Sequence, residues 1–241
     1  MSGFTDIHHH LIYGLDDGPR QMQETEAMLQ AAAKDETEAI IATPHVTPGI
    51  EPFESQQYME RLEEARQYCA RRNLPLKLYT GAEILYTPMS AKLLRERRIP
   101  TLAGTDYVLV EFMPNVRYED LQEAVLKLLR NGFLPVLAHV ERYGCLTHYV
   151  RRTARMKQTY EVSFQVNCST VIGGKGFWVN RCVDYLLKEH LVDYVASDAH
   201  NTNVRPTRMK QAYRALRERV GQEYAASLMG RIPNALTSAI E

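Results

Sequence analysis

Short apolar runs alternate with amphipathic stretches along the chain. The runs are bounded by polar or turn-forming residues, as β-strands are. Between them, apolar residues recur at the three-and-four spacing of one buried helix face, as in Tyr58, Leu62, Ala65 and Cys69 and again within 121–129. The pattern predicts strands at residues 4–8, 39–43, 76–83, 107–112, 134–139, 163–167 and 192–197.

The predicted elements follow one another in the order β, α, β, α. A helix of about a dozen residues can return the chain for a parallel crossover, so we expect a parallel sheet with helices outside it. We predict one α/β domain over residues 1–241, a distorted seven-stranded (β/α)7 barrel resembling a TIM barrel. An open doubly wound sheet has the same alternation, but its ligands gather at one switch point.

Metal-compatible side chains follow nearly every predicted strand. In a parallel barrel, the C-terminal ends of all strands lie on one face, so residues far apart in the sequence converge there. Such convergence is what a site for several metal ions requires. The strand-end residues are His8, His10, His45, Glu83, Glu111, His139, Asp198 and His200.

Composition limits the classes of partner. Lys+Arg and Asp+Glu number 29 each among 241 residues, so no net positive field draws the chain to nucleic acid or a membrane surface. No apolar run approaches the ~18 residues of a membrane span. The four cysteines form no Cys-x-x-Cys pair, which suits a reducing compartment. We therefore expect a cytoplasmic protein without nucleic-acid or membrane partners.

The run from His8 to His10 carries the first candidate ligands. Alternation along a strand places His8 and His10 on one side and His9 on the other, so the outer two can bind one metal ion. A fragment of a purification tag is the alternative explanation, but the run continues an apolar strand. A strand-end histidine taken alone, such as His45, is more often a hydrogen-bonded structural residue; several on one rim favour metal binding.

Carboxylates add to the histidines. Glu83 and Glu111 follow apolar strands, where burial of an unpaired charge is costly, so each needs a cation or a strong donor nearby. The segment from Asp16 to Pro19 predicts a turn, and Asp17 in it is a further candidate ligand. Imidazole nitrogen and carboxylate oxygen without thiolate suit Mn²⁺, Fe, Zn²⁺ or Mg²⁺, and this ligand chemistry does not choose among them.

A set of short motifs occurs in order across the whole chain. The motifs are His8-x-His10, Asp17-Gly18-Pro19, Gly81-Ala82-Glu83, Val110-Glu111-Phe112, Ala138-His139-Val140-Glu141-Arg142-Tyr143, Ala196-Ser197-Asp198-Ala199-His200 and Arg205-Pro206. Together they resemble the polymerase-and-histidinol-phosphatase (PHP) superfamily. The Asp-Asp-Gly-Pro, His-Val-Glu-Arg-Tyr and Arg-Pro segments resemble its branch of bacterial manganese-dependent protein tyrosine phosphatases from capsule and exopolysaccharide loci.

The resemblance implies a site with three divalent metal ions, manganese being expected and Fe, Zn or Mg being alternatives. The implied ligands of the first ion are His8, His10, Glu83 and Asp198. Glu83 would bridge to a second ion that is also held by Glu111 and His139. The implied ligands of the third are Asp17, His45 and His200. Every one of these positions carries a suitable side chain.

Hydrolysis of a phosphate ester at such a site needs no protein nucleophile, since neighbouring divalent ions activate water and hold the phosphoryl oxygens. Arg142 and Arg205 follow ligand segments and are our candidates for binding the phosphoryl group, because a guanidinium pairs with two of its oxygens. Taken singly, each would be expected to be a surface arginine. Cys145 and Arg151 have the spacing of a thiolate phosphatase loop, but the residues between them lack the glycines that cradle phosphate.

The resemblance also implies a partner, a phosphotyrosine-bearing bacterial tyrosine kinase that regulates polysaccharide export. Three other functions stay open. A PHP phosphatase of a small molecule such as histidinol phosphate would keep the metal ligands and differ in its pocket walls. An amidohydrolase shares the barrel and the His-x-His start, but typically has a bridging lysine where this chain has Glu83 or Glu111. A binding protein that has lost turnover would hold metal without hydrolysing an aryl phosphate.

Two further features concern the surroundings of the site. The segment 173–176 is rich in glycine, lacks the spacing of a nucleotide P-loop and predicts a turn before the next helix. Four aromatic residues near ligand segments could line a pocket or serve packing alone: Tyr13, Tyr86, Phe112 and Tyr143.

Overall fold

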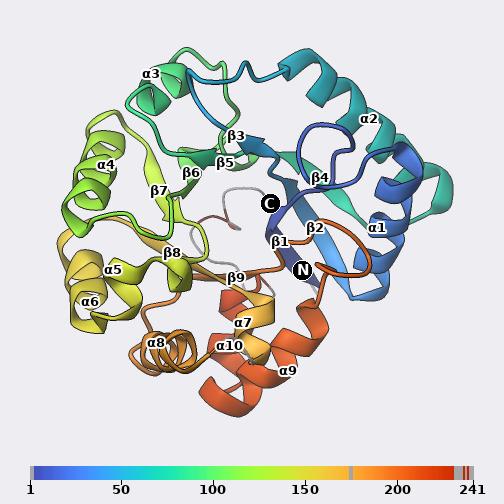
Figure 1. The fold of residues 1–241 in the computed structure, drawn as a ribbon. Helices are drawn as coiled ribbons and strands as arrows, with labels where there is room; N and C mark the ends of the chain where they lie inside the picture. The colour runs from blue at the N-terminus through green and yellow to red at the C-terminus, as the bar shows by residue number, and fades with distance from the viewer. Residues whose placement is uncertain (1–2, 174–175, 231–235, 237, 239–241) are drawn as a thin grey trace.

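A curled sheet of parallel strands lies at the centre of the molecule, with helices arranged around it (Figure 1). The structure is a computed structural model that describes residues 3–173, 176–230, 236 and 238. The strands are β1 (Phe4–His9), β2 (Thr37–Ala42), β3 (His45–Val46), β4 (Lys77–Thr80), β5 (Glu83–Leu85), β6 (Tyr107–Glu111), β7 (Leu134–Leu137), β8 (Ser163–Asn167) and β9 (Tyr194–Ala196).

Ten α-helices and two short 3-10 helices connect and cover these strands within the described residues. The α-helices are α1 (Met22–Lys34), α2 (Ser55–Arg72), α3 (Ser90–Arg95), α4 (Tyr118–Arg130), α5 (Gly144–Thr147), α6 (Val150–Thr159), α7 (Cys168–Ile172), α8 (Phe177–Lys188), α9 (Met209–Val220) and α10 (Gln222–Leu228). The 3-10 helices are η1 (Leu102–Gly104) and η2 (Val140–Arg142). Of the predicted turn 173–176, Gly174 and Lys175 lie outside the described residues.

All paired strands run parallel, in the orders β4-β2-β1 and β3-β5-β6-β7-β8-β9. The last and first strands also adjoin one another. The N–H of Asp198 donates to the carbonyl of His8, and the N–H of His10 donates to the carbonyl of Ala199, both at 2.9 Å. The sheet therefore curls on itself, and its C-terminal strand ends face a common space.

The predicted count of seven strands is not confirmed, because the described residues form nine strand segments. The predicted strand 76–83 is broken into β4 and β5, and the two-residue β3 is absent from the prediction. Pro44 has no N–H to donate, so the hydrogen bonds between neighbouring strands are interrupted between β2 and β3. At the neighbouring break, a Cβ on Gly81 would lie 2.6 Å from Cγ2 of Ile41, which leaves room only for glycine.

Two apolar layers hold the sheet. The predicted helix faces are confirmed, since the face of α2 that contains Tyr58 and Leu62 and the face of α4 that contains Leu121 and Leu128 are buried. A separate cluster fills the inside of the curl, with members from β1, β2, β6, β7 and β9, among them Ile7, Ile41, Leu109, Val136 and Ala196. None of the helices in the described ranges is both long enough and apolar enough to cross a membrane.

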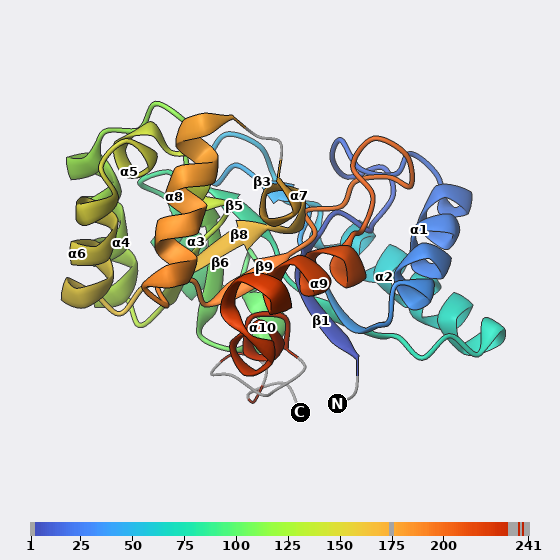
Figure 2. The same cartoon turned by 90° about the horizontal axis from the view of Figure 1, so that it is seen from below.

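One rim of the curled sheet collects the loops that follow the strands. In Figure 2, β1 rises from the lower edge, and the loop after β9 lies on the upper side together with the start of α8 and with α5. The side chains discussed below lie on this rim.

Candidate metal centre

His8 and His10 project to the same side of β1 and its end, as the alternation predicts. Their Nε2 atoms lie 3.2 Å apart. His9 is buried, and neither of its ring nitrogens has a hydrogen-bond partner among the described residues. Burial, together with the nearby His10 and His200, lowers the pKa of His9 to about 3, so this ring is neutral. His8 and His10 face the other candidate ligands on the rim, whereas His9 does not. We call this set the rim cluster: His8, His10, Asp17, His45, Glu83, Glu111, His139, Asp198 and His200.

Glu83, the first residue of β5, is the centre of the cluster. Its Oε2 lies 3.0 Å from His8 Nε2, 3.1 Å from His10 Nε2 and 3.1 Å from His45 Nδ1. Its Oε1 lies 2.8 Å from His139 Nε2. The Glu83 side chain is fully buried. Imidazoles from four separate positions thus surround one buried carboxylate, which are the surroundings a bridging ligand needs.

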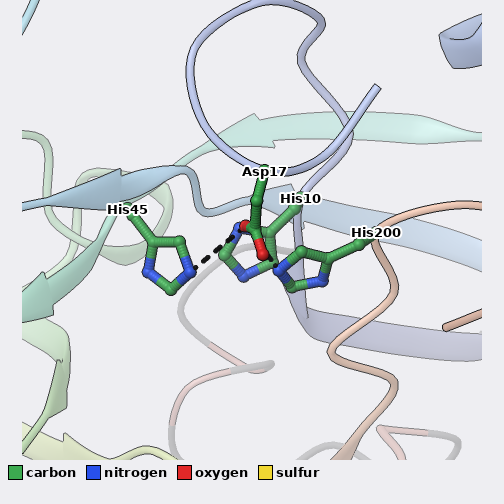
Figure 3. Close-up of side chains that lie close together, drawn as sticks. All are labelled: His10, Asp17, His45 and His200. Carbon is green, nitrogen blue, oxygen red and sulfur yellow. Dashed lines mark ion pairs between the residues drawn. The ribbon is translucent and has the colours of Figure 1, made fainter. Parts of the chain in front are cut away.

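Three groups of side chains have potential ligand atoms within 4.8 Å of one another. The fully buried group contains His8, His10, Glu83 and Asp198. The second contains His45, Glu83 and Glu111. The third contains His10, Asp17, His45 and His200 and is drawn in Figure 3.

Asp17 reaches the third group from the loop after β1, as Figure 3 shows. Its Oδ1 lies 3.0 Å from His200 Nε2 and 3.5 Å from His45 Nε2. The rings of His10 and His200 stack with their centroids 3.7 Å apart. Residues from opposite ends of the chain therefore meet around this carboxylate.

All of the ligands expected from the sequence lie in this one cluster, although their grouping differs in detail. His45 belongs to two groups, and His10 joins the third group as well as the first. His139 stands outside the three groups, yet its Nε2 lies 2.8 Å from Glu83 Oε1 and 3.6 Å from Glu111 Oε2. The expected set of Glu83, Glu111 and His139 is thus also in contact.

Two of these residues adopt left-handed backbone conformations. The φ angle is +33° at His139 and +54° at Asp198. Such conformations cost of the order of 1–3 kcal/mol for a non-glycine residue and concentrate at functional sites. The N–H of His139 donates to Gln165 Oε1 at 2.8 Å, which helps to hold the strained turn after β7. Backbone strain at two residues of one cluster indicates that the placement of their side chains serves function.

Asp16 orients two of the histidines, a role that was not predicted from the sequence. Its Oδ2 lies 2.6 Å from His10 Nδ1 and accepts a hydrogen bond from the N–H of His45 at 3.1 Å. The Nδ1–H of His10 is therefore used by Asp16, and Nε2 is left to face the cluster. The signal in the sequence was an aspartate directly beside a candidate ligand.

Gln165 and Asn167 of β8 are two more missed residues. Gln165 Oε1 accepts from His8 Nδ1 at 3.2 Å, and Gln165 Nε2 donates to Asn167 Oδ1 at 2.8 Å. Asn167 Nδ2 donates to Asp198 Oδ2 at 2.7 Å. The two amides stand two positions apart in β8 and so share a side, whereas the apolar Phe164 and Val166 lie on the other side. This alternation in a buried strand is the signal that could have identified them.

Charge pairing dominates the titration of the cluster. Burial by itself would lower the pKa of His10, but Asp16 and Glu83 raise it to about 10. Burial by itself would raise the pKa of Glu83, but His8, His10 and His139 hold it well below its usual range. Without metal, protons on His8 and His10 therefore balance carboxylate charge, and a bound cation would displace them.

Several atoms of the cluster are not satisfied by hydrogen bonds. Glu83 Oε2 and His200 Nε2 are buried and have no hydrogen-bond partner among the described residues. The contacts of Glu83 Oε2 with three imidazoles have the distance of hydrogen bonds but not their direction. The Nδ1 atoms of His8 and His10 are bonded to Gln165 and Asp16. In the neutral form of both rings, the Nε2 lone pairs therefore point at each other and at Glu83 Oε2. Divalent cations that prefer nitrogen and oxygen ligands fit this arrangement.

The two arginines expected to bind phosphate both contact Asp198. Arg142 Nη2 donates to Oδ2 at 2.7 Å, and Arg205 Nη2 donates to Oδ1 at 3.0 Å. Arg205 Nη1 also donates to Asp17 Oδ2 at 3.2 Å. With Arg208, they line a pocket of about 430 Å³ that Asp198 borders, which we call the basic pocket. Three guanidinium groups beside a cation-compatible cluster suit an anion of the phosphoryl type.

Other sequence candidates have structural roles. The Tyr143 side chain is fully buried, and its hydroxyl donates to the carbonyl of Ala138 at 2.7 Å and accepts from the N–H of Phe112 at 3.2 Å. Tyr86 stacks on Phe112 with centroids 5.5 Å apart. Burial raises the pKa of the Cys145 thiol to about 11, which agrees with the expectation that it is not a thiolate nucleophile.

Comparison with known proteins identifies the family. A family model described as "Capsular polysaccharide synthesis, CpsB/CapC" matches residues 4–238. The chain belongs to the CpsB/CapC family. The tyrosine-protein phosphatase CpsB of Streptococcus pneumoniae is 30% identical over 227 residues, which cover 92% of this chain and 93% of the relative. The family resemblance predicted from the motifs is thereby confirmed.

Solved structures agree with this CpsB/CapC membership. A structure described as that of YwqE from Bacillus subtilis and CpsB from Streptococcus pneumoniae, metal-dependent tyrosine phosphatases, matches with a TM-score of 0.85 and 26% identity. The match covers 93% of this chain and 90% of the other. A histidinol phosphate phosphatase from Lactococcus lactis, complexed with zinc, L-histidinol and phosphate, matches with a TM-score of 0.56 at 14% identity, covering 91% and 94%. The second likeness shows a shared fold alone.

Proposed function

We propose that this CpsB/CapC protein is a metal-dependent tyrosine phosphatase that dephosphorylates a bacterial tyrosine kinase and so regulates capsular or exopolysaccharide synthesis. The observation that carries the proposal is the convergence of histidines and carboxylates from many strand ends around the buried Glu83. The similarity of about nine-tenths of the chain to proteins described as tyrosine phosphatases supports the proposal. The four free cysteines suit the cytoplasmic location that such a role requires.

Three divalent cations, with manganese as the expected element, would be held by the side chains of the rim cluster. When bound, such ions supply the charge that activates water and neutralises phosphoryl oxygens. The residues that would hold them are His8, His10, Asp17, His45, Glu83, Glu111, His139, Asp198 and His200.

The protein's own residues then bind and orient. In this proposal, Arg142 and Arg205 bind oxygens of the phosphoryl group, because both guanidinium groups already converge on Asp198 at the edge of the basic pocket. Asp16 and Gln165 keep the Nε2 atoms of His10 and His8 directed at the cluster. A tyrosine leaving group has a pKa near ~10, so its departure needs less help from an acid than that of an alkyl alcohol.

In terms of fold, we infer that β2 with β3, and β4 with β5, act as interrupted single strands of a seven-stranded barrel in one domain over residues 1–241. The support is the pairing register, which is unchanged across the breaks. Ala42 pairs with Thr80 before them, and His45 pairs with Glu83 after them.

The proposed function is tested by a phosphatase assay of EDTA-treated protein to which individual metal ions are restored. A phosphotyrosine peptide and histidinol phosphate are compared as substrates. We expect Mn²⁺ to restore hydrolysis of the peptide, with a higher kcat/KM than for histidinol phosphate. A preference for histidinol phosphate would instead support a small-molecule phosphatase. Hydrolysis of neither substrate with any metal ion would refute phosphatase function.

A further inference from the structure

A second pocket adjoins the basic pocket on the same rim. It has a volume of about 540 Å³, within the range of ~300–1,000 Å³ that is common for ligand sites, and η2, α5, α7 and the start of α8 contribute to its wall. The two pockets share Arg142 and Ser169. A ligand with its phosphoryl group in the basic pocket can therefore extend directly into the second one.

The wall of the second pocket carries exposed aromatic side chains. Phe177 and Trp178, in the first turn of α8, are 69% and 51% exposed. Their ring centroids lie 5.3 Å apart, and His148 contacts the Trp178 ring edge-on, also at 5.3 Å. We call the pocket with Thr147, His148, Phe177 and Trp178 in its wall the aromatic groove. Exposed aromatic residues of this kind are enriched where proteins bind other polypeptides.

Positive charge lies at one end of the aromatic groove and on a helix that packs against two of its wall elements. Arg142 is at the junction with the basic pocket. The helix α6, which packs against α5 and α8, contains no acidic residue and exposes Arg151 and Arg152. The carboxylate in the lining, Glu141, is buried. This charge pattern complements a polypeptide that carries phosphate and acidic residues.

We propose that the aromatic groove binds the polypeptide segment next to the phosphotyrosine of the substrate, with an apolar or aromatic side chain against Trp178. The inference rests on the proposed function and adds a determinant of protein over small-molecule substrates. The basic pocket selects the phosphoryl group, which all aryl phosphates share. The groove selects what only a protein substrate brings, namely the residues that flank the tyrosine.

The groove has a built-in reporter, because Trp178 is the single tryptophan in the sequence. Protein loaded with Mn²⁺ is titrated with a short peptide in which phosphonomethyl-phenylalanine, a non-hydrolysable phosphotyrosine analogue, is flanked by leucine and glutamate. We expect a saturable change in tryptophan emission with the peptide and none with phenyl phosphate, which fills the basic pocket alone. An emission that does not respond to the peptide at any concentration overturns the proposal. An emission that responds instead to protein concentration would identify a contact between copies of the chain and also overturn it.

Kinetics supply the second test. We expect Trp178→Ala to raise KM for a phosphotyrosine peptide about tenfold without changing kcat, as loss of an aromatic anchor does. Its kinetics with p-nitrophenyl phosphate should stay within about twofold of wild type. Trp178→Phe should recover most of the peptide affinity. Met59→Ala, which removes an exposed apolar side chain from α2, is the matched control and should change neither substrate.

The outcomes separate the two proposals. Equal effects of Trp178→Ala on both substrates, or no effect on either, would overturn the groove as a peptide site. If the metal-loaded wild type hydrolyses neither substrate, the proposed function fails, and the fluorescence titration alone still decides whether the groove binds the peptide.

Discussion

The centre of the rim around Glu83 and the space directly beneath it are both buried, but they are built from opposite chemistry. Beneath the rim, Ile7, Ile41, Leu109 and Val136 pack together as an apolar cluster. On the rim, imidazoles and carboxylates crowd around Glu83. Burial of apolar side chains contributes to stability directly. Burial of charged groups costs desolvation free energy, which only partners of good geometry offset. The interior thus supports the fold, whereas the rim groups the side chains that could hold cations.

The two regions are assembled from the same strands. In β6, Leu109 belongs to the inner cluster, and Glu111, two positions later on the same side, belongs to the rim. In β7 and its end, Val136 lies inside and His139 lies on the rim. Changes a few residues apart should therefore have separable effects on activity and on stability.

The largest expected effect is on activity, from a rim substitution. Asp198→Ala removes a candidate cation ligand and the common anchor of Arg142 and Arg205, so it should lower metal-dependent aryl phosphatase activity by roughly a thousandfold or more. Its circular dichroism spectrum should match that of wild type. Asp106→Ala, at an exposed carboxylate, is the control and should be fully active. Full activity of Asp198→Ala would remove this residue from the site.

An interior substitution should show the reverse pattern. Leu109→Ala should destabilise the metal-free protein by about 2–5 kcal/mol, because a fully buried leucine is replaced by a cavity. At a temperature where the variant is folded, its kcat should stay close to wild type. Urea unfolding followed by circular dichroism measures the stability change. A large loss of kcat in a stably folded Leu109→Ala protein would mean that the two regions are not separable.

Gln165 of β8 supports the rim, because its Oε1 contacts both His8 and the strained turn at His139. Gln165→Ala should lower metal affinity by about 10–100-fold, since the orientation of His8 is no longer fixed. Excess metal should restore most of the activity, in contrast to Asp198→Ala. Calorimetric metal titration of both proteins gives the comparison, and an unchanged affinity would show that Gln165 does not orient the ligand.

The smallest expected effect is a pH dependence of opposite sign with and without metal. The pKa of His10 is raised from 6.5 to about 10, so its protonation stabilises the metal-free protein below pH 6.5 and this contribution is lost as the pH rises toward 10. Metal binding needs neutral imidazole and therefore strengthens over the same range. Thermal melts at pH 6.5 and 8.5 should show Tm falling without metal and the stabilisation by Mn²⁺ growing. Parallel trends in both forms would contradict a competition between protons and metal.

The meeting of the candidate ligands on one rim was predictable from the sequence, because all of them except Asp17 stand at or just beyond a predicted strand end. Local alternation was enough to separate His8 and His10 from His9. Contacts across the curl were not predictable in the same way. The sharing of His45 between two groups follows from its pairing with Glu83 on the neighbouring strand, which no local pattern specifies.

Features outside the motifs were also missed. Trp178 lies in the first turn of α8, and the sequence alone gives no reason to expect an aromatic residue there to be exposed. Its exposure follows from how α8 lies against α5 and α7. Gln165 and Asn167 were visible as the polar positions of an alternating strand, but their partners His8 and Asp198 come from other parts of the sheet. Register and curvature, rather than residue type, decide such contacts.

The central claim is that the rim holds divalent cations around Glu83. Anomalous X-ray scattering at the manganese edge, from crystals of the Mn²⁺-loaded protein, tests it directly. We expect three peaks within the rim cluster, each about 2.0–2.3 Å from imidazole nitrogens and carboxylate oxygens, with Glu83 between two of them. Crystals of the loaded protein without any peak beside Glu83 would contradict it.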